Sequence, residues 1–216
     1  MAILGKLMRN DNIVSRLKKN INPSTNIVDQ STEILARAFL TDLLFMHAFP
    51  DEKTRLRLLL ELFRLNFNYG FLYGDIYFAE GRGVSIWLPP DNYRITFQKA
   101  ITAGMLVTPL KIGLRGVFRL GRINSVSEIM HARFAPDRHW YLFLLGVDPL
   151  SQGMGWGRKI IQPVLDQADS DRLPCYLETN NYSAVLFYKK LGFDIVAEEN
   201  PKTVNFPIWG MRRENR

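Results

Sequence analysis

The segment that most constrains this chain is LLGVDPLSQGMGWGRKII, residues 144–161, in which an apolar strand runs through a glycine-rich loop into a helix. The apolar run from Trp140 to Val147 is typical of a strand covered on both faces, and residues 157–169 have the pattern of the helix that follows. Glycines at positions 153, 155 and 157 let the backbone approach a ligand closely. Because the first N–H groups of a helix attract anions, the segment predicts a cradle for a pyrophosphate group.

Two other phosphate-binding loops do not fit this segment. A Walker A loop requires Gly-Lys followed by Ser or Thr, whereas Gly157 precedes Arg158, Lys159 and Ile160. A Rossmann fingerprint requires a third glycine at the position of Arg158. What remains is the pattern Gln-x-x-Gly-x-Gly from Gln152 to Gly157, and a turn that merely connects strand to helix stays open as the alternative.

The rest of the chain predicts a mixed α/β domain. Downstream of the loop, the patterns predict a parallel strand over 173–177, a helix over 181–191 and strands over 193–197 and 204–211. Upstream, they predict helices over 31–40, capped by Asp29 or Ser31, and over 52–68, then a hairpin of strands 71–80 and 83–88. Residues 93–130 return to a helical pattern that is broken near Thr108-Pro109.

A basic stripe lies in that last helical region. Lys111, Arg115, Arg119 and Arg122 recur at helical spacing opposite Leu114, Val117 and Phe118. We interpret the stripe as the solvated, charged face of a surface helix. A helix of this kind can also bind membranes or acidic partners, so that alternative stays open.

Length and composition limit the class of protein. A chain of 216 residues with 47% hydrophobic residues fits one domain with an insertion, and its net charge of +7 favours an anionic partner. No apolar run reaches the roughly 20 residues of a membrane span, and no signal-peptide core is present. One cysteine, Cys175, excludes an internal disulfide, and we expect a soluble, cytoplasmic protein.

The glycine-rich loop and a second motif resemble the GNAT superfamily of N-acetyltransferases. The second motif is NNYSAVLFYKKLGF, residues 180–193, in which an Asn precedes a helix that ends in Tyr, two polar residues and Leu-Gly-Phe. Within the superfamily, GVSIWLPP, HWYLFLLGVDP, YLETN and IWGMRR resemble the puromycin N-acetyltransferase-like branch. The resemblance covers residues 83–89 and 139–213 well, and residues 1–70 and 94–135 poorly.

The resemblance implies the GNAT fold, which is a mostly antiparallel mixed sheet splayed at its centre and flanked by helices. It also implies acetyl-CoA as co-substrate. Backbone groups of Leu145 and Val147 would pair with the pantetheine arm, Gly146 would mark a bulge, and Asn181 would contact the cofactor arm. The pyrophosphate would be lined by the loop and first helical turn, namely Gln152, Gly153, Met154, Gly155, Trp156, Gly157 and Arg158.

Two residues are candidates for the proton transfers of acetyl transfer. The resemblance places Tyr188 beside the sulfur, and a phenol with a pKa of about 10 can deliver a proton to a leaving thiolate whose pKa is about 8.5. Glu178 ends the apolar strand LPCYL at an edge where ligands of open α/β sheets gather, so it could accept the ammonium proton. Core packing for Tyr188 and a solvated or capping role for Glu178 are the alternatives; Glu80 and Glu128 are weaker candidates for the base.

Other chemistries find little support in the sequence. His47, His131 and His139 lack metal-ligand spacing, so we expect no metal. Cys175 lies in an apolar strand and should be inert packing. Aromatic and basic residues are not interleaved as in an RNA-binding sheet, so nucleic acid is not an expected partner.

The sequence thus predicts one acetyltransferase domain that moves an acetyl group from acetyl-CoA to a primary amine of a small molecule by direct attack. We divide it into a basic lead over 1–25, a helical insertion over 93–134 that shapes the acceptor region, and a cofactor-binding core over 139–213. The oxyanion would be held by a strand N–H near Val147. A non-catalytic acyl-CoA-binding sensor and a basic membrane or nucleic-acid binder are the alternative functions. A homodimer is a possible assembly.

Overall fold

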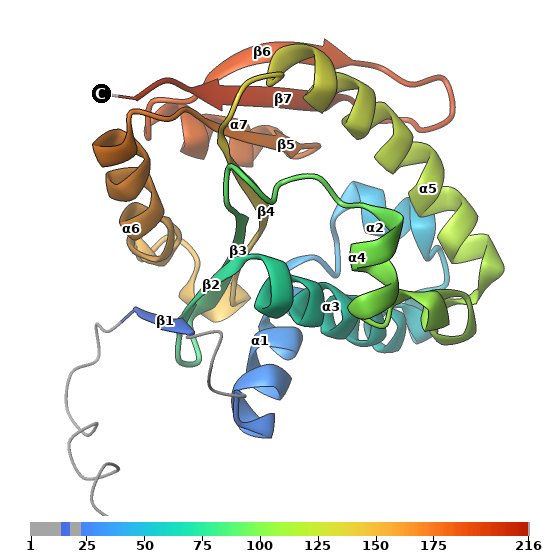
Figure 1. Ribbon diagram of the computed structural model, residues 1–216. Helices are drawn as coiled ribbons and strands as arrows, with labels where there is room; N and C mark the ends of the chain where they lie inside the picture. Colours follow the sequence, from blue (N-terminus) through green and yellow to red (C-terminus); the bar gives the residue numbers. More distant parts are fainter. Residues whose placement is uncertain (1–13, 18–22, 216) are drawn as a thin grey trace, which may run out of the picture.

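The computed structural model describes residues 14–17 and 23–215, which form a seven-stranded sheet with helices on both faces (Figure 1). The strand order is β1-β2-β3-β4-β5-β7-β6. The strands are β1 (Ser15–Leu17), β2 (Asp75–Ala79), β3 (Gly83–Leu88), β4 (Trp140–Val147), β5 (Cys175–Thr179), β6 (Asp194–Glu199) and β7 (Ile208–Arg213). The helices are α1 (Thr25–Ala38), α2 (Leu43–Ala48), α3 (Glu52–Tyr73), α4 (Phe97–Thr102), α5 (Thr108–Phe134), α6 (Trp156–Asp171) and α7 (Tyr182–Lys189), with short 3-10 turns at Met105–Val107 and Pro149–Ser151.

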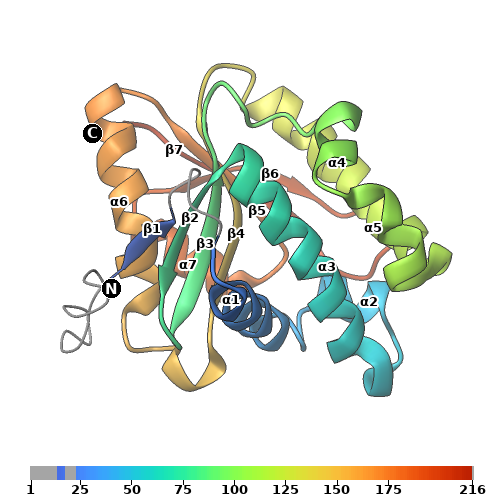
Figure 2. The same ribbon diagram turned by 60° about the horizontal axis from the view of Figure 1, so that its bottom comes forward.

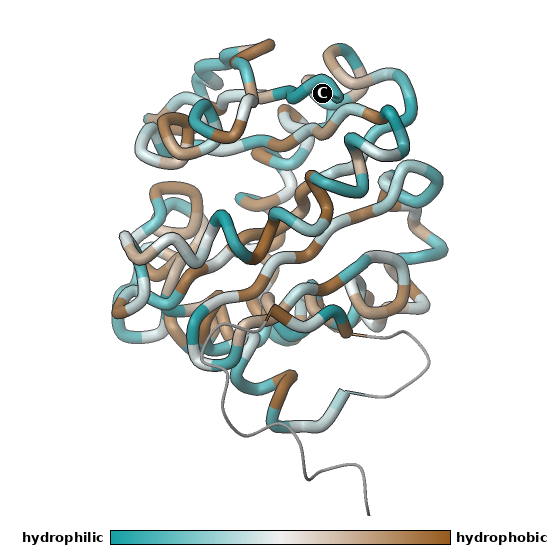
Figure 3. The backbone as a smooth tube through the Cα atoms, turned by 90° about the vertical axis from the view of Figure 1, so that its left-hand side faces the viewer, coloured by the Kyte–Doolittle hydropathy of each residue, from teal (hydrophilic) through white to brown (hydrophobic). Residues whose placement is uncertain are grey.

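Helices cover both faces of the sheet (Figure 2), and alternating side chains of the strands form an apolar layer on each face. On β3, Val84 and Ile86 pack with α1, α2 and α3, whereas Trp87 packs with α6 and α7. All three are fully buried, as period-two alternation requires of a strand covered on both sides. Along the helices that cover the sheet, hydrophobic and hydrophilic residues alternate (Figure 3).

The centre of the sheet is splayed. Neighbouring strands pair antiparallel except β4 and β5, which run parallel and pair at two positions, Trp140 with Cys175 and Tyr141 with Tyr176. Beyond Tyr141, no residue of β4 pairs with β5 in the part of the chain that the structure describes. The two strands therefore separate toward their carboxyl ends, and the expected GNAT arrangement of the sheet is confirmed.

The irregularity of β4 does not lie at Gly146, which we expected to mark the bulge. The register shifts where Ile86 pairs with Leu144 and Trp87 with Leu142, so Phe143 is the extra residue. Gly146 is needed for another reason, because a Cβ there would lie 2.9 Å from Leu35 Cδ2 of α1.

The helical region over 93–134 exposes much of its apolar side. Leu114 and Phe118, opposite the basic stripe, are 75% and 66% exposed, whereas Ile112 and Ile123 are buried. Gly113 takes a non-helical conformation (φ 77°, ψ 151°), so Lys111 and the residues after Gly113 do not lie on one continuous helix. The basic stripe is partly paired, since Lys111 bonds Glu61 at 3.1 Å and Arg119 donates to the Ala48 carbonyl.

Several element boundaries also differ from expectation. Helix α1 starts at Thr25 with Ser24 as its cap, not near Asp29 or Ser31. Helix α3 continues to Tyr73, so β2 begins at Asp75 and not at residue 71, and β7 begins at Ile208 and not at residue 204. Helix α2 and strand β1 were not predicted. Most of the basic lead over 1–25 lies outside the described residues.

Within the described residues, none of the helices combines the length and the apolar character that crossing a bilayer requires.

Packing at Gly146 makes a testable prediction. Gly146→Ala should lower the free energy of unfolding by about 1–3 kcal/mol, because the new methyl group overpacks against Leu35. Gly121→Ala is the matched control, since a Cβ at this exposed position of α5 meets nothing within 4 Å. It should raise stability by up to about 1 kcal/mol through helix propensity. Urea denaturation of both variants checks the pair, and equal stability changes would contradict the packing account.

Candidate functional site

A cleft of about 1430 Å³ opens between the separated ends of β4 and β5. It extends from the start of α6 at one end to α5 and the segment after β3 at the other, and the loop between α1 and α2 closes one side. Ten of the residues predicted from the sequence line it: Leu145, Val147, Gln152, Gly153, Gly155, Trp156, Gly157, Glu178, Asn181 and Tyr188.

The first turn of α6 is built to present unpaired backbone N–H groups to this cleft. Gly153 and Gly155 adopt positive φ angles of 76° and 80°, where a side chain would be strained. Helices α1, α2, α3, α4 and α7 follow a residue whose side chain accepts a backbone N–H. Helices α5 and α6 have no side-chain cap; α5 has Pro109 in its first turn, whereas α6 follows Gly155. The N–H groups of this turn and the positive end of the helix dipole can therefore act on an anion.

Neighbouring contacts hold the loop against β4. The Gln152 side chain donates a 3.1 Å hydrogen bond to the carbonyl of Val147, which fixes the loop on the end of the strand. A Cβ at Gly157 would lie 3.1 Å from the Phe187 ring of α7, so α6 and α7 approach closely there. Buried Trp156 lies under the cations of Arg82 and Lys159.

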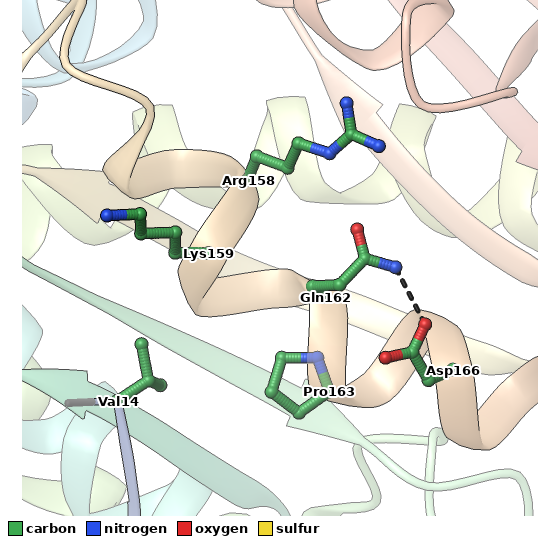
Figure 4. A pocket seen from close by; sticks show the side chains of 6 residues that line it. All are labelled: Val14, Arg158, Lys159, Gln162, Pro163 and Asp166. Carbon is green, nitrogen blue, oxygen red and sulfur yellow. Dashed lines mark hydrogen bonds between the residues drawn. The ribbon is translucent and has the colours of Figure 1, made fainter. Parts of the chain in front are cut away.

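Three of the residues that the resemblance assigned to the cofactor do not line the cleft. Gly146 packs against α1, and Met154 is 62% exposed at the tip of the loop. Arg158 lies on the outer side of α6, where it borders a shallow hollow of about 370 Å³ (Figure 4). In that hollow Gln162 donates to Asp166, one turn further along the helix.

The other end of the cleft contains a buried carboxyl group, that of Glu178 on β5. Its side chain is 8% exposed, and its Oε2 accepts a 2.8 Å hydrogen bond from the Tyr141 hydroxyl of β4. The second oxygen, Oε1, is buried and has no hydrogen-bond partner among the described residues. Burial disfavours the charged form of a carboxyl group and raises the pKa of Glu178 to about 8. The hydrogen bond from Tyr141 acts in the opposite direction but is the smaller effect.

Tyrosines near this carboxyl are held in their neutral form. Burial and the Glu178 carboxylate raise the pKa of Tyr141 well above its ordinary value, and they raise the pKa of Tyr176 as well. Gly210 of β7 pairs with Glu178 of β5. Because Gly210 has no side chain, the Tyr176 hydroxyl can lie over it. Burial also raises the pKa of Tyr188, which therefore keeps its proton.

Two histidines that the sequence did not bring together complete the site. His131 of α5 and His139, just before β4, approach with their Nε2 atoms 2.6 Å apart, and His131 Nδ1 lies 3.7 Å from Glu178 Oε1. Burial lowers the pKa of both imidazoles, that of His131 to about 3, so both are neutral. The one signal in the sequence is HARFAPDRH, in which two histidines flank a Pro-containing turn between a helix and a strand.

Aromatic rings surround the histidines. The Tyr93 ring stacks on the His131 ring, with 5.4 Å between their centroids, and its centroid lies 4.4 Å from that of His139. The ring centroids of Tyr141 and His131 are 4.5 Å apart. Tyr93, His131 and Tyr141 all line the cleft, together with Glu178. This end of the cleft thus combines aromatic walls with the buried carboxyl group of Glu178.

Other sequence candidates fall outside this arrangement. Glu80 is exposed next to the β2–β3 turn, whereas Glu128 is an exposed residue on the cleft's rim. Cys175 is buried in β5, where burial raises the pKa of its thiol to about 12. Among the residues that the structure describes, no group of three or more His, Cys, Asp or Glu side chains is placed to hold a metal ion.

Comparison with known proteins agrees with this geometry. Residues 112–193 match the model of the Acetyltransferase (GNAT) family. An uncharacterized N-acetyltransferase of Schizosaccharomyces pombe is 31% identical over 117 residues, which cover 51% of this chain and 47% of that protein. The N-alpha-acetyltransferase RimI of Mycobacterium tuberculosis is 31% identical over 85 residues, which cover 39% of this chain and 46% of RimI. The matches thus span about half the length of these curated relatives.

Solved structures share the fold. A crystal structure of histone acetyltransferase HPA2 and related acetyltransferase from Corynebacterium glutamicum superimposes with a TM-score of 0.65 at 21% identity, covering 94% of this chain and 97% of that one. The yncA protein of Salmonella typhimurium, solved with its cofactor acetyl-CoA, gives 0.51 at 14% identity and covers 96% and 95%. The family model thus matches part of the chain, residues 112–193, and the sheet has the fold of GNAT acetyltransferase structures.

The raised pKa of Glu178 predicts a pH-dependent stability. The protonated carboxyl stabilises the folded state fully below about pH 4.5, and this contribution is lost as the pH rises toward 8. Wild type should therefore lose stability relative to Glu178→Gln over this window, by up to about 1.36 kcal/mol per pH unit. Denaturant titrations between pH 4.5 and 8.5 measure the difference. Glu198→Gln, at an exposed position of β6, is the control, and a Glu178→Gln curve parallel to wild type would rule out the raised pKa.

Proposed function

We propose that the chain is an N-acetyltransferase that moves the acetyl group of acetyl-CoA to a primary amine of a small molecule by direct attack. The observation that carries the proposal is the pairing, in one cleft, of an uncapped helix start at Gly155 with a buried, incompletely hydrogen-bonded carboxyl group at Glu178. The first suits the phosphates of a cofactor, and the second suits the proton of an ammonium group.

The cofactor end of the cleft would take acetyl-CoA along β4. The pyrophosphate would bind the N–H groups of Trp156, Gly157 and Arg158 at the start of α6, and Gln152 and the loop glycines would hold this turn in place. The pantetheine arm would lie against the β5-facing edge of β4 at Leu145 and Val147, where β4 pairs with no strand. A strand N–H near Val147 would hold the oxyanion.

The proton transfers would use Glu178 and Tyr188. An acceptor amine arrives as an ammonium ion, gives its proton to the Glu178 carboxylate and then attacks the acetyl carbonyl as a neutral amine. A base with a pKa of about 8 suits this exchange, because it is partly ionised at neutral pH yet still basic. Tyr188 remains protonated and can supply a proton to the leaving thiolate.

Small cationic amines are the acceptor class that the site favours. The aromatic rings of Tyr93, His131 and Tyr141 can attract an ammonium group, and the acidic Glu178 adds to this attraction. Burial of Glu178 restricts the reaction to an amine on a slender chain that can reach the end of the cleft. RimI is named an N-alpha-acetyltransferase, so a peptide with a free α-amino group is the acceptor to compare against.

The finer assignments made from the sequence are retained as proposals. The motifs around β3, β4, β5 and β7 support the puromycin N-acetyltransferase-like branch. The single buried cysteine, Cys175, fits a reducing compartment, and we propose a cytoplasmic enzyme that needs no metal. A homodimer is the proposed assembly to test.

Cofactor binding gives a direct prediction. Acetyl-CoA at 100 times its dissociation constant should add about 2.7 kcal/mol to stability and raise the melting temperature. Gly155→Val should abolish the shift, because a branched side chain at φ 80° distorts the start of α6. Gly81→Val is the control, since Gly81 has a similar φ of 63° in the β2–β3 turn, outside the cleft. Wild type without any shift at millimolar acetyl-CoA would contradict the proposal.

Substitution of the two proton-transfer residues separates an enzyme from a silent acyl-CoA binder. Tyr188→Phe and Glu178→Gln should each leave acetyl-CoA affinity near wild type but lower kcat by about 10²-fold or more. In wild type, kcat should fall below about pH 8 as Glu178 becomes protonated, and Glu178→Gln should lose this limb of the profile. Thiol release with a panel of alkyl diamines, aryl alkylamines and amino-terminal peptides provides the assay. Cofactor binding without turnover of any amine would favour the sensor alternative.

A further inference from the structure

We propose that His139 holds His131 in the tautomer whose Nδ1 lone pair faces Glu178, so that Nδ1 of His131 accepts a hydrogen bond from the Glu178 carboxyl group once Glu178 has taken the proton of the substrate. His131 is then a positioning residue for the base, and His139 acts on that base without touching it. The inference rests on the proposed function for its catalytic meaning, but its geometry can be tested without turnover.

The series of contacts starts at a backbone carbonyl. His139 Nδ1 lies 2.7 Å from the carbonyl oxygen of Asp137, and a carbonyl can only accept, so Nδ1 of His139 carries a proton. The position of this carbonyl is itself fixed, because the Asp137 carboxylate accepts two hydrogen bonds from Arg212 of β7, at 2.7 and 2.8 Å. The segment before β4 is thereby held against β7.

Each later step follows from the first. A neutral His139 that is protonated at Nδ1 has a lone pair at Nε2. Because His131 Nε2 lies 2.6 Å from that atom, His131 must donate there and carries its proton on Nε2. A neutral His131 with this tautomer has its lone pair at Nδ1, and Nδ1 is the atom that lies 3.7 Å from Glu178 Oε1.

Glu178 provides the complementary group. Its Oε2 accepts a hydrogen bond from the Tyr141 hydroxyl, whereas Oε1 has no hydrogen-bond partner among the described residues. An ionised Oε1 would face the lone pair of His131, which is unfavourable, whereas a protonated Oε1 could donate to it after a movement of under about 1 Å. The histidine pair thus favours the acid form of Glu178, because His131 Nδ1 can accept a hydrogen bond from the protonated carboxyl group.

Charged and titratable groups around the carboxyl are consistent with this assignment. Tyr141 and Tyr176 face Glu178 from β4 and β5, and Glu128 of α5 acts on Tyr141. Arg94 acts on His131 and lowers its pKa further, as does His139. At His139, burial is the largest effect and lowers the pKa, although the Asp137 carbonyl and carboxylate raise it. Neutral imidazoles are therefore favoured at both positions.

This arrangement has a chemical consequence for acetyl transfer. The ammonium N–H bond breaks and an O–H bond forms on Glu178, leaving a neutral amine that can attack the thioester. With the new hydroxyl directed to His131, the proton is held away from the amine lone pair, so the amine is less readily protonated again.

The tautomers can be observed directly. In ¹⁵N-labelled protein at neutral pH, long-range ¹H–¹⁵N correlation spectra should show His131 protonated at Nε2 and His139 at Nδ1, with neither residue an imidazolium. Observation of His131 protonated at Nδ1, or at both nitrogens, would overturn the proposal. This experiment uses the wild-type chain, so it does not depend on whether a variant folds.

Titration of Glu178 tests the coupling between the residues. The ¹³C carboxyl signal of Glu178, assigned by its loss in Glu178→Gln, should titrate about one pH unit lower in His139→Phe. Without His139, His131 is free to move its proton to Nδ1 and donate it to the ionised carboxylate. His131→Gln should titrate as wild type, because its amide nitrogen can donate to His139 while its oxygen accepts from Glu178. Ser125→Ala, at an exposed site on α5, is the unaffected control.

Two outcomes separate this inference from the proposed function. An unchanged or raised Glu178 titration in His139→Phe, with wild type fully active on amines, would refute the role of the histidines and leave the acetyltransferase assignment intact. The expected titrations in a protein that turns over no amine would do the reverse. In an active enzyme, the acidic limb of the kcat profile should move with the Glu178 titration in every variant.

Discussion

The separation of β4 from β5 is the constraint on which the rest of the structure depends. These strands run parallel and pair at two positions, Trp140 with Cys175 and Tyr141 with Tyr176. A short parallel pairing leaves backbone groups of β4 without a strand partner, and such groups are costly unless solvent or a ligand satisfies them. The cleft follows from this geometry, since α6 starts at one end of the gap and the Glu178 carboxyl lies at the other.

The two ends of the cleft differ in the way that charge is managed. At the start of α6, glycines with positive φ angles and the absence of a side-chain cap leave backbone N–H groups that can bind an anion. At Glu178, burial among tyrosines and neutral histidines disfavours a carboxylate, which makes the group a base near neutral pH. A cofactor with phosphates and a substrate with an ammonium group are the complementary pair, which is why we favour acetyl transfer over cofactor binding alone.

Much of the fold was predictable from local pattern, whereas part of the site was not. Strands β3 and β4 have their predicted bounds because two-sided burial leaves an unmistakable apolar run, and Gly153 and Gly155 take the positive φ angles that the loop required. The interruption of helix α5 was expected near Thr108-Pro109, whereas the non-helical residue within α5 is Gly113. Contact between His131 and His139 depends on where α5 returns to the sheet, which no periodicity in the sequence reports.

Hydrogen–deuterium exchange with and without acetyl-CoA tests the central claim most directly, because it reads the backbone N–H groups that the cleft leaves unpaired. We predict that the cofactor slows exchange in peptides covering residues 142–147 of β4 and 153–159 at the start of α6. Exchange in α1 and in the β6–β7 pair should change little. Protection confined to other parts of the chain, or no protection at saturating acetyl-CoA, would contradict the assignment of the separated strands as the cofactor site.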